Sequence, residues 1–312
     1  MMGKPVDAIW PQGLPVLRGL APAERLLLGL ILTLGAASVM LSAAFGRVVD
    51  WAGFLPGIAA ALAMIAVGAH ARGVRNAPRL GGTAIGIGLF MGFTAFASIF
   101  IFALFPLPNP LIDSQLISVD AALGYDWAGF VVGLAEYPLL ARGLGYLYHS
   151  SLPQMVLVII LLGVLRRELA MHRFLLVGMM CMTLTVGVWW LWPSIGPSAF
   201  ASIPAETAAR IGLVVNPAVG AHLQALVEVG PGVIGPETVM GVVAFPSYHI
   251  IMALMVVWYS RATFAFWPFA LAGLGMVPAT LAHGGHHLVD LLAGGLVFAG
   301  MVWAAGRMIP GR

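Results

Sequence analysis

Long stretches of apolar residues, nearly free of charge, limit this chain to a membrane-spanning fold. A helix needs about 20 apolar residues to cross the hydrocarbon core of a bilayer, and eight stretches reach or approach that length. Of all residues, 61% are hydrophobic and 9% are charged, whereas soluble domains carry about 25% charged residues. We therefore predict an all-α, polytopic membrane helix bundle with about eight spans, at 25–46, 52–70, 82–105, 153–166, 173–192, 246–260, 264–282 and 288–308.

The basic residues predict the orientation of these spans. If the N-terminus is cytoplasmic, twelve of the fifteen Lys and Arg residues fall on the cytoplasmic side, which is the distribution that the positive-inside rule describes. The other three, Arg47, Arg142 and Arg210, fall on the opposite side. Both long connections, 106–152 and 193–245, then lie outside the cytoplasm. The first of them is expected to form helices at the membrane interface.

Charge and cysteine content exclude two further features. The formal net charge of +3 is too small and too dispersed to indicate a nucleic-acid partner. Cys181 is the only cysteine, so no intrachain disulfide can form. The first 24 residues lack the basic and apolar regions of a secretory signal peptide, and we interpret them as a short N-terminal arm.

The turn before the last span, "HGGHHLVD" (283–290), holds the first candidates for chemistry. His286 and Asp290 are four residues apart, a spacing that places two side chains on one face of a helix. The carboxylate would accept a hydrogen bond from one ring nitrogen and leave the other nitrogen nucleophilic. An acid within a membrane span is costly and is a functional candidate by default.

A second candidate lies at the start of the sixth predicted span, in "FPSYH" (245–249). Pro246 suits the opening of a helix, and the first-turn N–H groups of Ser247, Tyr248 and His249 would then be free to bind an anion such as phosphate. His249 can donate or accept a proton. Together with the histidine turn on the same membrane face, this set fits phosphoryl transfer through a phosphohistidine.

These motifs resemble those of the type 2 phosphatidic acid phosphatase superfamily. "FPSYH" and the His-x-x-x-Asp motif are similar to its second and third motifs, and most similar to those of the inositol phosphorylceramide synthase and sphingomyelin synthase branch. The segments "PLIDSQLISVDAALGYDW" (110–127) and "WPSIGPSAF" (192–200) also resemble parts of that branch. The likeness covers about 106–300. It implies a six-span catalytic core, residues 81–312, preceded by two accessory spans within 25–80 and the arm 1–24.

The resemblance also implies roles for individual residues. His286 would be the nucleophile, Asp290 would orient it, and His249 would protonate the leaving group. Ser247 and Tyr248 would bind phosphate oxygens. Enzymes of this superfamily need no metal or other cofactor, so none is expected.

The chain departs from the superfamily pattern where phosphate-binding cations are usual. The first motif, Lys-x6-Arg-Pro, is absent, and Thr280 stands where the third motif has an arginine. We expect Arg142 or Arg210, in the long outer connections, to replace these cations. His287 resembles the second histidine of a His-His pair in the synthase branch and is a candidate for substrate binding, with a packing role as the alternative. "WPSIGPSAF" either lines the site or only ends a span.

The expected function is transfer of a phosphoryl or phospho-headgroup between a lipid and an alcohol. A phospholipid or sphingolipid would be the donor and an alcohol such as inositol the acceptor. The alternatives are a lipid phosphate phosphatase of the phosphatidic acid or polyprenyl phosphate type, a histidine-ligated metal or haem protein, and a transporter, for which no internal repeat is evident. The arginine-rich, lysine-poor composition favours a bacterial inner membrane, with the active site facing the periplasm, or a lumen in another host.

Overall fold

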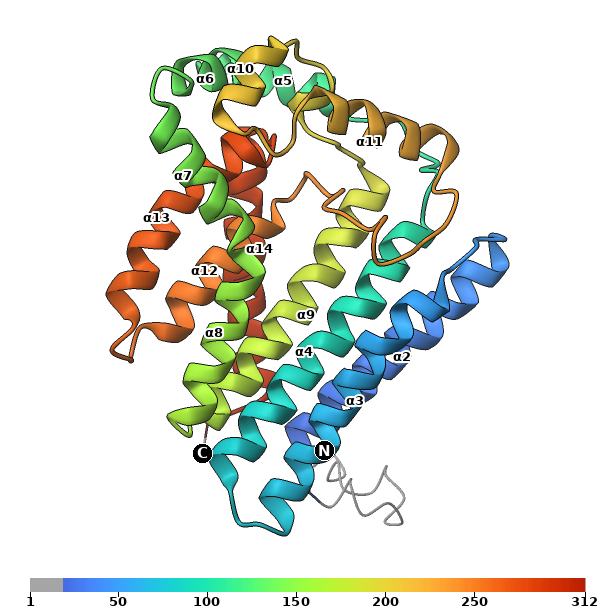
Figure 1. The fold of residues 1–312 in the computed structure, drawn as a ribbon, viewed down its shortest axis with the longest axis vertical. Helices are drawn as coiled ribbons and strands as arrows, with labels where there is room; N and C mark the ends of the chain where they lie inside the picture. The colour runs from blue at the N-terminus through green and yellow to red at the C-terminus, as the bar shows by residue number, and fades with distance from the viewer. Residues whose placement is uncertain (1–18, 312) are drawn as a thin grey trace.

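A computed structural model of the protein describes residues 19–311, and within them it is all-helical. The helices run roughly parallel as a long bundle, capped at one end by shorter helices (Figure 1). They are α2 (Pro22–Ala44), α3 (Trp51–Gly73), α4 (Pro78–Ala103), α5 (Asp113–Ala122), α6 (Trp127–Leu134), α7 (Pro138–His149), α8 (Ser151–Val164), α9 (Glu168–Leu191), η2 (Pro197–Ala199), α10 (Ala205–Ile211), α11 (Pro217–Val229), α12 (Tyr248–Ser260), α13 (Phe266–His283) and α14 (Leu288–Met308).

A helix forms at each of the eight predicted spans. Five helices, α2, α3, α4, α9 and α14, are long and apolar enough to cross a membrane on their own. Two bent pairs, α5 with α6 and α7 with α8, bring the number to seven if each pair is one span. The sixth predicted span, α12, is a shorter apolar helix of 13 residues. The chain is therefore an integral, multi-pass membrane protein.

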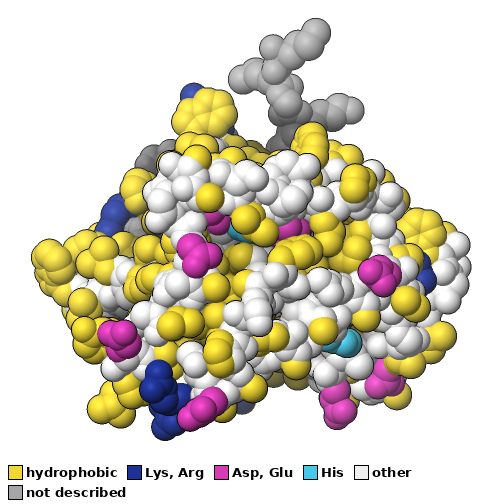
Figure 2. Space-filling view, turned by 90° about the horizontal axis from the view of Figure 1, so that it is seen from above, with side chains coloured by type: hydrophobic (Ala, Val, Ile, Leu, Met, Phe, Trp, Pro, Cys, Tyr) yellow, Lys and Arg dark blue, Asp and Glu magenta, His cyan; other side chains and the backbone are white. Residues whose placement is uncertain are grey.

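Both long connections lie at the same end of the bundle, which we call the outer end. The first forms α5, α6 and α7, and the second forms α10 and α11, so these helices cap the bundle (Figure 1). Both ends of the described chain lie at the opposite end. Seen from the outer end, the surface is a mixture of apolar and acidic side chains with few basic ones (Figure 2).

The N-terminal helices α2 and α3 pack along α4 and are joined to the rest of the bundle at both ends. Away from the cap, the buried Glu24 of α2 accepts hydrogen bonds from Arg72 (2.6 and 2.9 Å) and lies 3.2 Å from His172 of α9. At the outer end, Val49 forms a β-bridge with Ile234 of the second long connection. The predicted arm 1–24 lies mostly outside the described residues, and its last three residues belong to α2.

Candidate active site

The two predicted motifs meet because α12 and α14 pack together with their N-termini at the outer end. The backbone N–H of Ser247, the N-cap of α12, donates to the Asp290 carbonyl of α14 over 3.0 Å. This approach requires Gly294 one turn later, since a Cβ there would lie 2.6 Å from the Ser247 carbonyl oxygen. The Ser247 amide is therefore not free for an anion, and the first-turn amides of Tyr248 and His249 remain.

His286 and Asp290 make the predicted contact. His286 Nδ1 lies 2.9 Å from Asp290 Oδ2, and both side chains are buried. The same carboxylate oxygen accepts the backbone N–H of His287 over 2.9 Å, so Asp290 caps the start of α14 as well as holding the ring. His286 thus sits in the turn before the helix, and the capping interaction fixes its position. With its proton on Nδ1, its Nε2 presents a lone pair.

The free side of His286 faces the start of α12. Its Nε2 lies 3.4 Å from the hydroxyl of Ser247, which is fully buried. The rings of His286 and His249 are 6.1 Å apart between centroids, at 67°. The ring nitrogen of His286 that Asp290 does not hold is thus near a hydroxyl, and a second imidazole lies beside the same ring.

The side chain of Tyr248 points elsewhere. Its hydroxyl donates to the Gly178 carbonyl of α9 over 3.1 Å, and its ring lines a small apolar cavity with Phe93 and Phe174 in the bundle interior. Only the backbone N–H of Tyr248 is placed to meet a ligand at the helix start. Tyr248 can therefore make the predicted contact with substrate through its main chain but not through its phenol.

His287 lies between two carboxylates. Its Nδ1 is 2.7 Å from Asp120 Oδ2 and its Nε2 is 3.4 Å from Asp113 Oδ1, and the side chain is fully buried. Burial alone would lower the pKa of this imidazole, but the surrounding carboxylates of Asp113, Asp290 and Asp120 outweigh burial and raise that pKa above its ordinary value. Because both nitrogens are engaged within the protein, neither is open to a substrate.

Asp113 and Asp120 were missed by the sequence analysis. Both lie on α5, are buried, and are seven residues apart, which puts them on one face two turns apart. Two acids at that spacing in a chain so poor in charge are the signal that could have indicated them. Asp120 also accepts the backbone N–H of Leu288 over 3.0 Å, so α5 is tied directly to the start of α14.

Asp113 also holds the segment "WPSIGPSAF". Its carboxylate accepts hydrogen bonds from the Ser194 hydroxyl (2.8 Å) and from the backbone N–H groups of Ile195 (3.2 Å) and Gly196 (2.8 Å). Gly196 has a φ of +87°, and a Cβ there would collide with the Gly285 carbonyl, so only glycine fits. This segment therefore packs directly on the histidine turn and does more than end a span.

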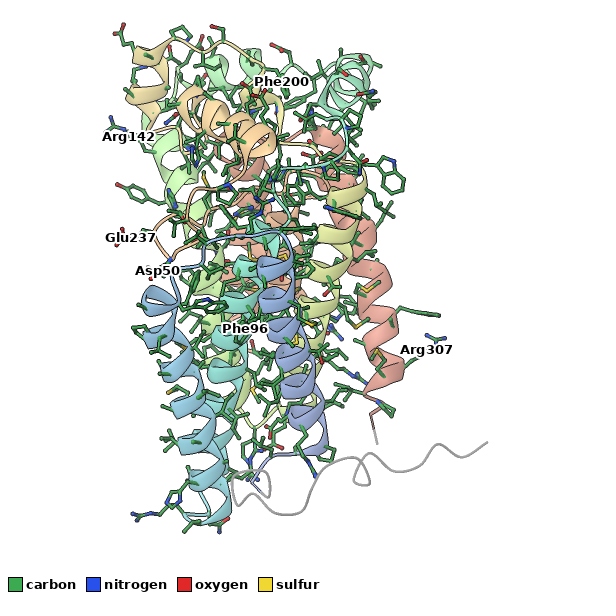
Figure 3. The ribbon with its side chains drawn as sticks, turned by 90° about the vertical axis from the view of Figure 1, so that its right-hand side faces the viewer. Asp50, Phe96, Arg142, Phe200, Glu237 and Arg307 are labelled. Atoms are coloured by element: carbon green, nitrogen blue, oxygen red, sulfur yellow. The ribbon has the colours of Figure 1, made fainter. Side chains whose placement is uncertain are left out.

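The two loop arginines are exposed at the rim of the cap. Arg142 Nε donates to the Arg210 carbonyl over 3.0 Å, and the side chain of Arg142 points away from the bundle (Figure 3). Within residues 19–311, neither arginine makes a hydrogen bond or ion pair with Ser247, His249 or His286. Among the described residues, no direct contact supports the expected replacement of the missing cations by Arg142 or Arg210.

Comparison with known proteins agrees with the two motifs. A family model for the PAP2 superfamily matches residues 114–305, which is more than half of the 312-residue chain. The chain belongs to the PAP2 superfamily. As PAP2 proteins act on phosphate esters, this protein is a lipid phosphoesterase or phosphotransferase. The PAP2 match contains Ser247, His249, His286 and Asp290, and it begins after α4.

No curated protein and no solved structure matches the chain. Within residues 19–311, no group of three or more His, Cys, Asp or Glu side chains is arranged to hold a metal ion. The PAP2 match thus gives the reaction class. It does not distinguish the branch of the superfamily, the lipid or the acceptor.

Proposed function

We propose that this PAP2 protein is a lipid phosphotransferase that moves a phosphoryl or phospho-headgroup from a lipid to an alcohol through a phosphohistidine at His286. The observation that carries the proposal is the asymmetry of the His286 ring. Asp290 occupies Nδ1 at 2.9 Å, Nε2 lies 3.4 Å from the Ser247 hydroxyl, and the His249 ring is 6.1 Å away between centroids. An oriented imidazole with one open nitrogen beside a second imidazole is what covalent catalysis with general acid–base assistance requires.

The first step would form the phosphoenzyme. The Nε2 lone pair of His286 attacks phosphorus, and the bond from phosphorus to the leaving oxygen breaks as His249 donates a proton to that oxygen. Asp290 stabilises the positive charge that develops on the imidazole, as a buried carboxylate does in other oriented histidines. In the second step an acceptor hydroxyl gives its proton to His249 and attacks phosphorus, and the P–N bond breaks.

Hydrogen-bond donors around His286 would bind the phosphate oxygens. The Ser247 hydroxyl is 3.4 Å from His286 Nε2, and the first-turn amides of α12 point their positive ends towards the same space. Donors fixed before the reaction stabilise charge that grows in the transition state. We assign Arg142 and Arg210 the weaker role of attracting an anionic headgroup from the rim.

The cap over the site favours transfer over hydrolysis. Helix α5 contacts α14, α6 contacts α13, and the segment 192–200 lies against the histidine turn, and a covered site protects a phosphoenzyme from water. The proposed donor is a phospholipid or sphingolipid and the proposed acceptor an alcohol such as inositol, and the two motifs favour the inositol phosphorylceramide synthase-like branch. A phosphatase would share the first step and use water in the second.

The proposal includes the topology. The N-terminus would lie in the cytoplasm and the cap in the periplasm of a bacterial inner membrane, or in a lumen. Helices α2 and α3 would be accessory to a six-span core from residue 81 onwards. Tagging residue 312 and the α10–α11 loop for proteolysis in oriented vesicles tests the orientation, because the two tags should be cleaved from opposite sides.

The deciding experiment measures release and transfer of label from lipids that carry radioactive phosphate. Purified wild type, His286→Ala and the control His222→Ala, an exposed histidine of α11, are compared with chelator present, with and without inositol. We expect labelled inositol phosphate from wild type and His222→Ala only. Label released solely as free phosphate would replace the transferase by the phosphatase. Equal turnover in His286→Ala would remove His286 as nucleophile, and loss of wild-type activity in chelator would favour a metal.

A further inference from the structure

Tyr148 packs against both halves of the candidate site, although it belongs to neither motif. It lies in the last turn of α7, where α7 meets α8 at a 54° bend. Its ring stacks on His249 with centroids 4.2 Å apart and 24° between planes. The same ring also lies close to the histidine turn, since a Cβ added to Gly284 would lie 2.9 Å from Tyr148 Cε2. The ring is therefore wedged between α12 and the turn that carries His286.

The Tyr148 hydroxyl faces one ring nitrogen of His249. Its oxygen is 3.5 Å from His249 Nδ1, and no other hydrogen bond of this hydroxyl exists within residues 19–311. The position of the residue is well defined, because its side chain is buried and its carbonyl accepts the Ser151 hydroxyl over 2.7 Å. Catalytic hydrogen bonds are often long before substrate binds and shorten afterwards.

This contact matters for the protonation state of His249. A neutral imidazole carries its proton on one nitrogen, and the partner of the other nitrogen decides which. The imidazolium that acts as general acid carries a proton on each nitrogen, so its Nδ1–H donates to the Tyr148 oxygen and its Nε2–H is left for a substrate. After Nε2 gives up its proton, the neutral imidazole keeps its Nδ1 proton on that oxygen, as His286 keeps its Nδ1 proton on Asp290, and Nε2 can then accept a proton from the acceptor hydroxyl.

We propose that Tyr148 is a positioning residue for His249, whose stacked ring orients the imidazole and whose hydroxyl oxygen accepts from Nδ1–H, so that Nε2 exchanges the proton with the leaving group and the acceptor. The inference rests on the proposed function, because it assigns His249 the role of general acid. It adds a residue outside the two motifs and predicts a dependence on the leaving group. An alkoxide is a strong base that needs a proton to leave, whereas p-nitrophenolate is a weak base that leaves without one.

The test compares kcat for phosphatidic acid with kcat for p-nitrophenyl phosphate in the full-length protein in one detergent. The variants are Tyr148→Phe, which keeps the ring, Tyr148→Leu, which removes it, His249→Ala as reference, and Tyr146→Phe as a control on the same helix with 78% exposure. The ratio of the two activities is taken within each sample, so a partly unfolded preparation does not change it.

We expect Tyr148→Phe to lower the ratio of the two kcat values about 10-fold or more. Tyr148→Leu and His249→Ala should lower it further, towards the roughly 10²–10⁴-fold rate enhancement that a general acid contributes. Tyr146→Phe should leave it unchanged. A wild-type ratio in Tyr148→Phe and Tyr148→Leu, with a reduced ratio in His249→Ala, would overturn the role of Tyr148 and leave the proposed function intact. Absence of wild-type turnover on both substrates, with inositol present as the acceptor, would overturn the proposed function and this inference with it.

Discussion

Two adjacent histidines, His286 and His287, have opposite environments in the same turn. His286 has one nitrogen on Asp290 and the other near the hydroxyl of Ser247, with the ring of His249 close by. His287 has both nitrogens on carboxylates of α5 and is fully buried. The difference arises because α12 packs beside His286 and α5 packs beside His287. It teaches that a histidine in this motif is available for chemistry only where one of its nitrogens has no carboxylate partner.

The largest expected effect is on turnover and separates the two histidines. His286→Gln should lower turnover about 1,000-fold or more, because removing a nucleophile removes the covalent route. After brief incubation with radioactive lipid phosphate and an alkaline quench, label should remain on wild type and on His287→Asn but not on His286→Gln. Label retained on His286→Gln would mean that another residue is the nucleophile.

The second-largest expected effect is on stability, and for stability His287 matters more than His286. His287→Leu should lower the free energy of unfolding by about 3–5 kcal/mol, since it leaves the buried carboxylates of Asp113 and Asp120 without the imidazole between them. Thermal unfolding in detergent measures this, with His222→Leu as the control. Changing both aspartates to asparagine in the His287→Leu background should recover part of the loss. An unchanged midpoint would show that the cluster is not holding the cap.

The pH dependence of stability should also identify His287. Its pKa is raised in the folded protein, so folding is favoured by its protonated form. The contribution is complete below the unfolded value of about 6.5 and is lost as pH rises through the folded value. The thermal midpoint of wild type should therefore fall from pH 6 to pH 9 more than that of His287→Asn. If the thermal midpoints of the two proteins change equally with pH, His287 is not the source of the pH dependence.

The smallest expected effect concerns the rim. Arg142→Ala and Arg210→Ala should each raise KM for an anionic lipid less than about 10-fold, with kcat unchanged, because exposed charges interact weakly with a distant partner. The increase should disappear at high salt, where such charges are screened. A large fall in kcat would instead place one of these arginines against the reacting phosphate.

Much of the fold and part of the site follow from local sequence patterns. Apolar length predicted a helix at every proposed span, and the spacing of His286 and Asp290 predicted their contact. The bend between α7 and α8 was not predicted, because apolar length does not show where a helix breaks. Nor was the direction of the Tyr248 phenol, which depends on a carbonyl of α9, seventy residues away.

By itself, the sequence determined that this chain spans a membrane and that its basic residues divide unequally between the predicted loops. It also determined that the motifs at 245–249 and 283–290, whose residues suit phosphate chemistry, lie at the starts of helices. These features depend on composition and on residues a few positions apart. Only the tertiary structure decided which histidine nitrogens stay open and that Asp113, Asp120 and Tyr148 surround the motifs. Those contacts join residues 101 to 174 positions apart. They are set by how the cap helices pack on α12 and α14, and no local pattern records that packing.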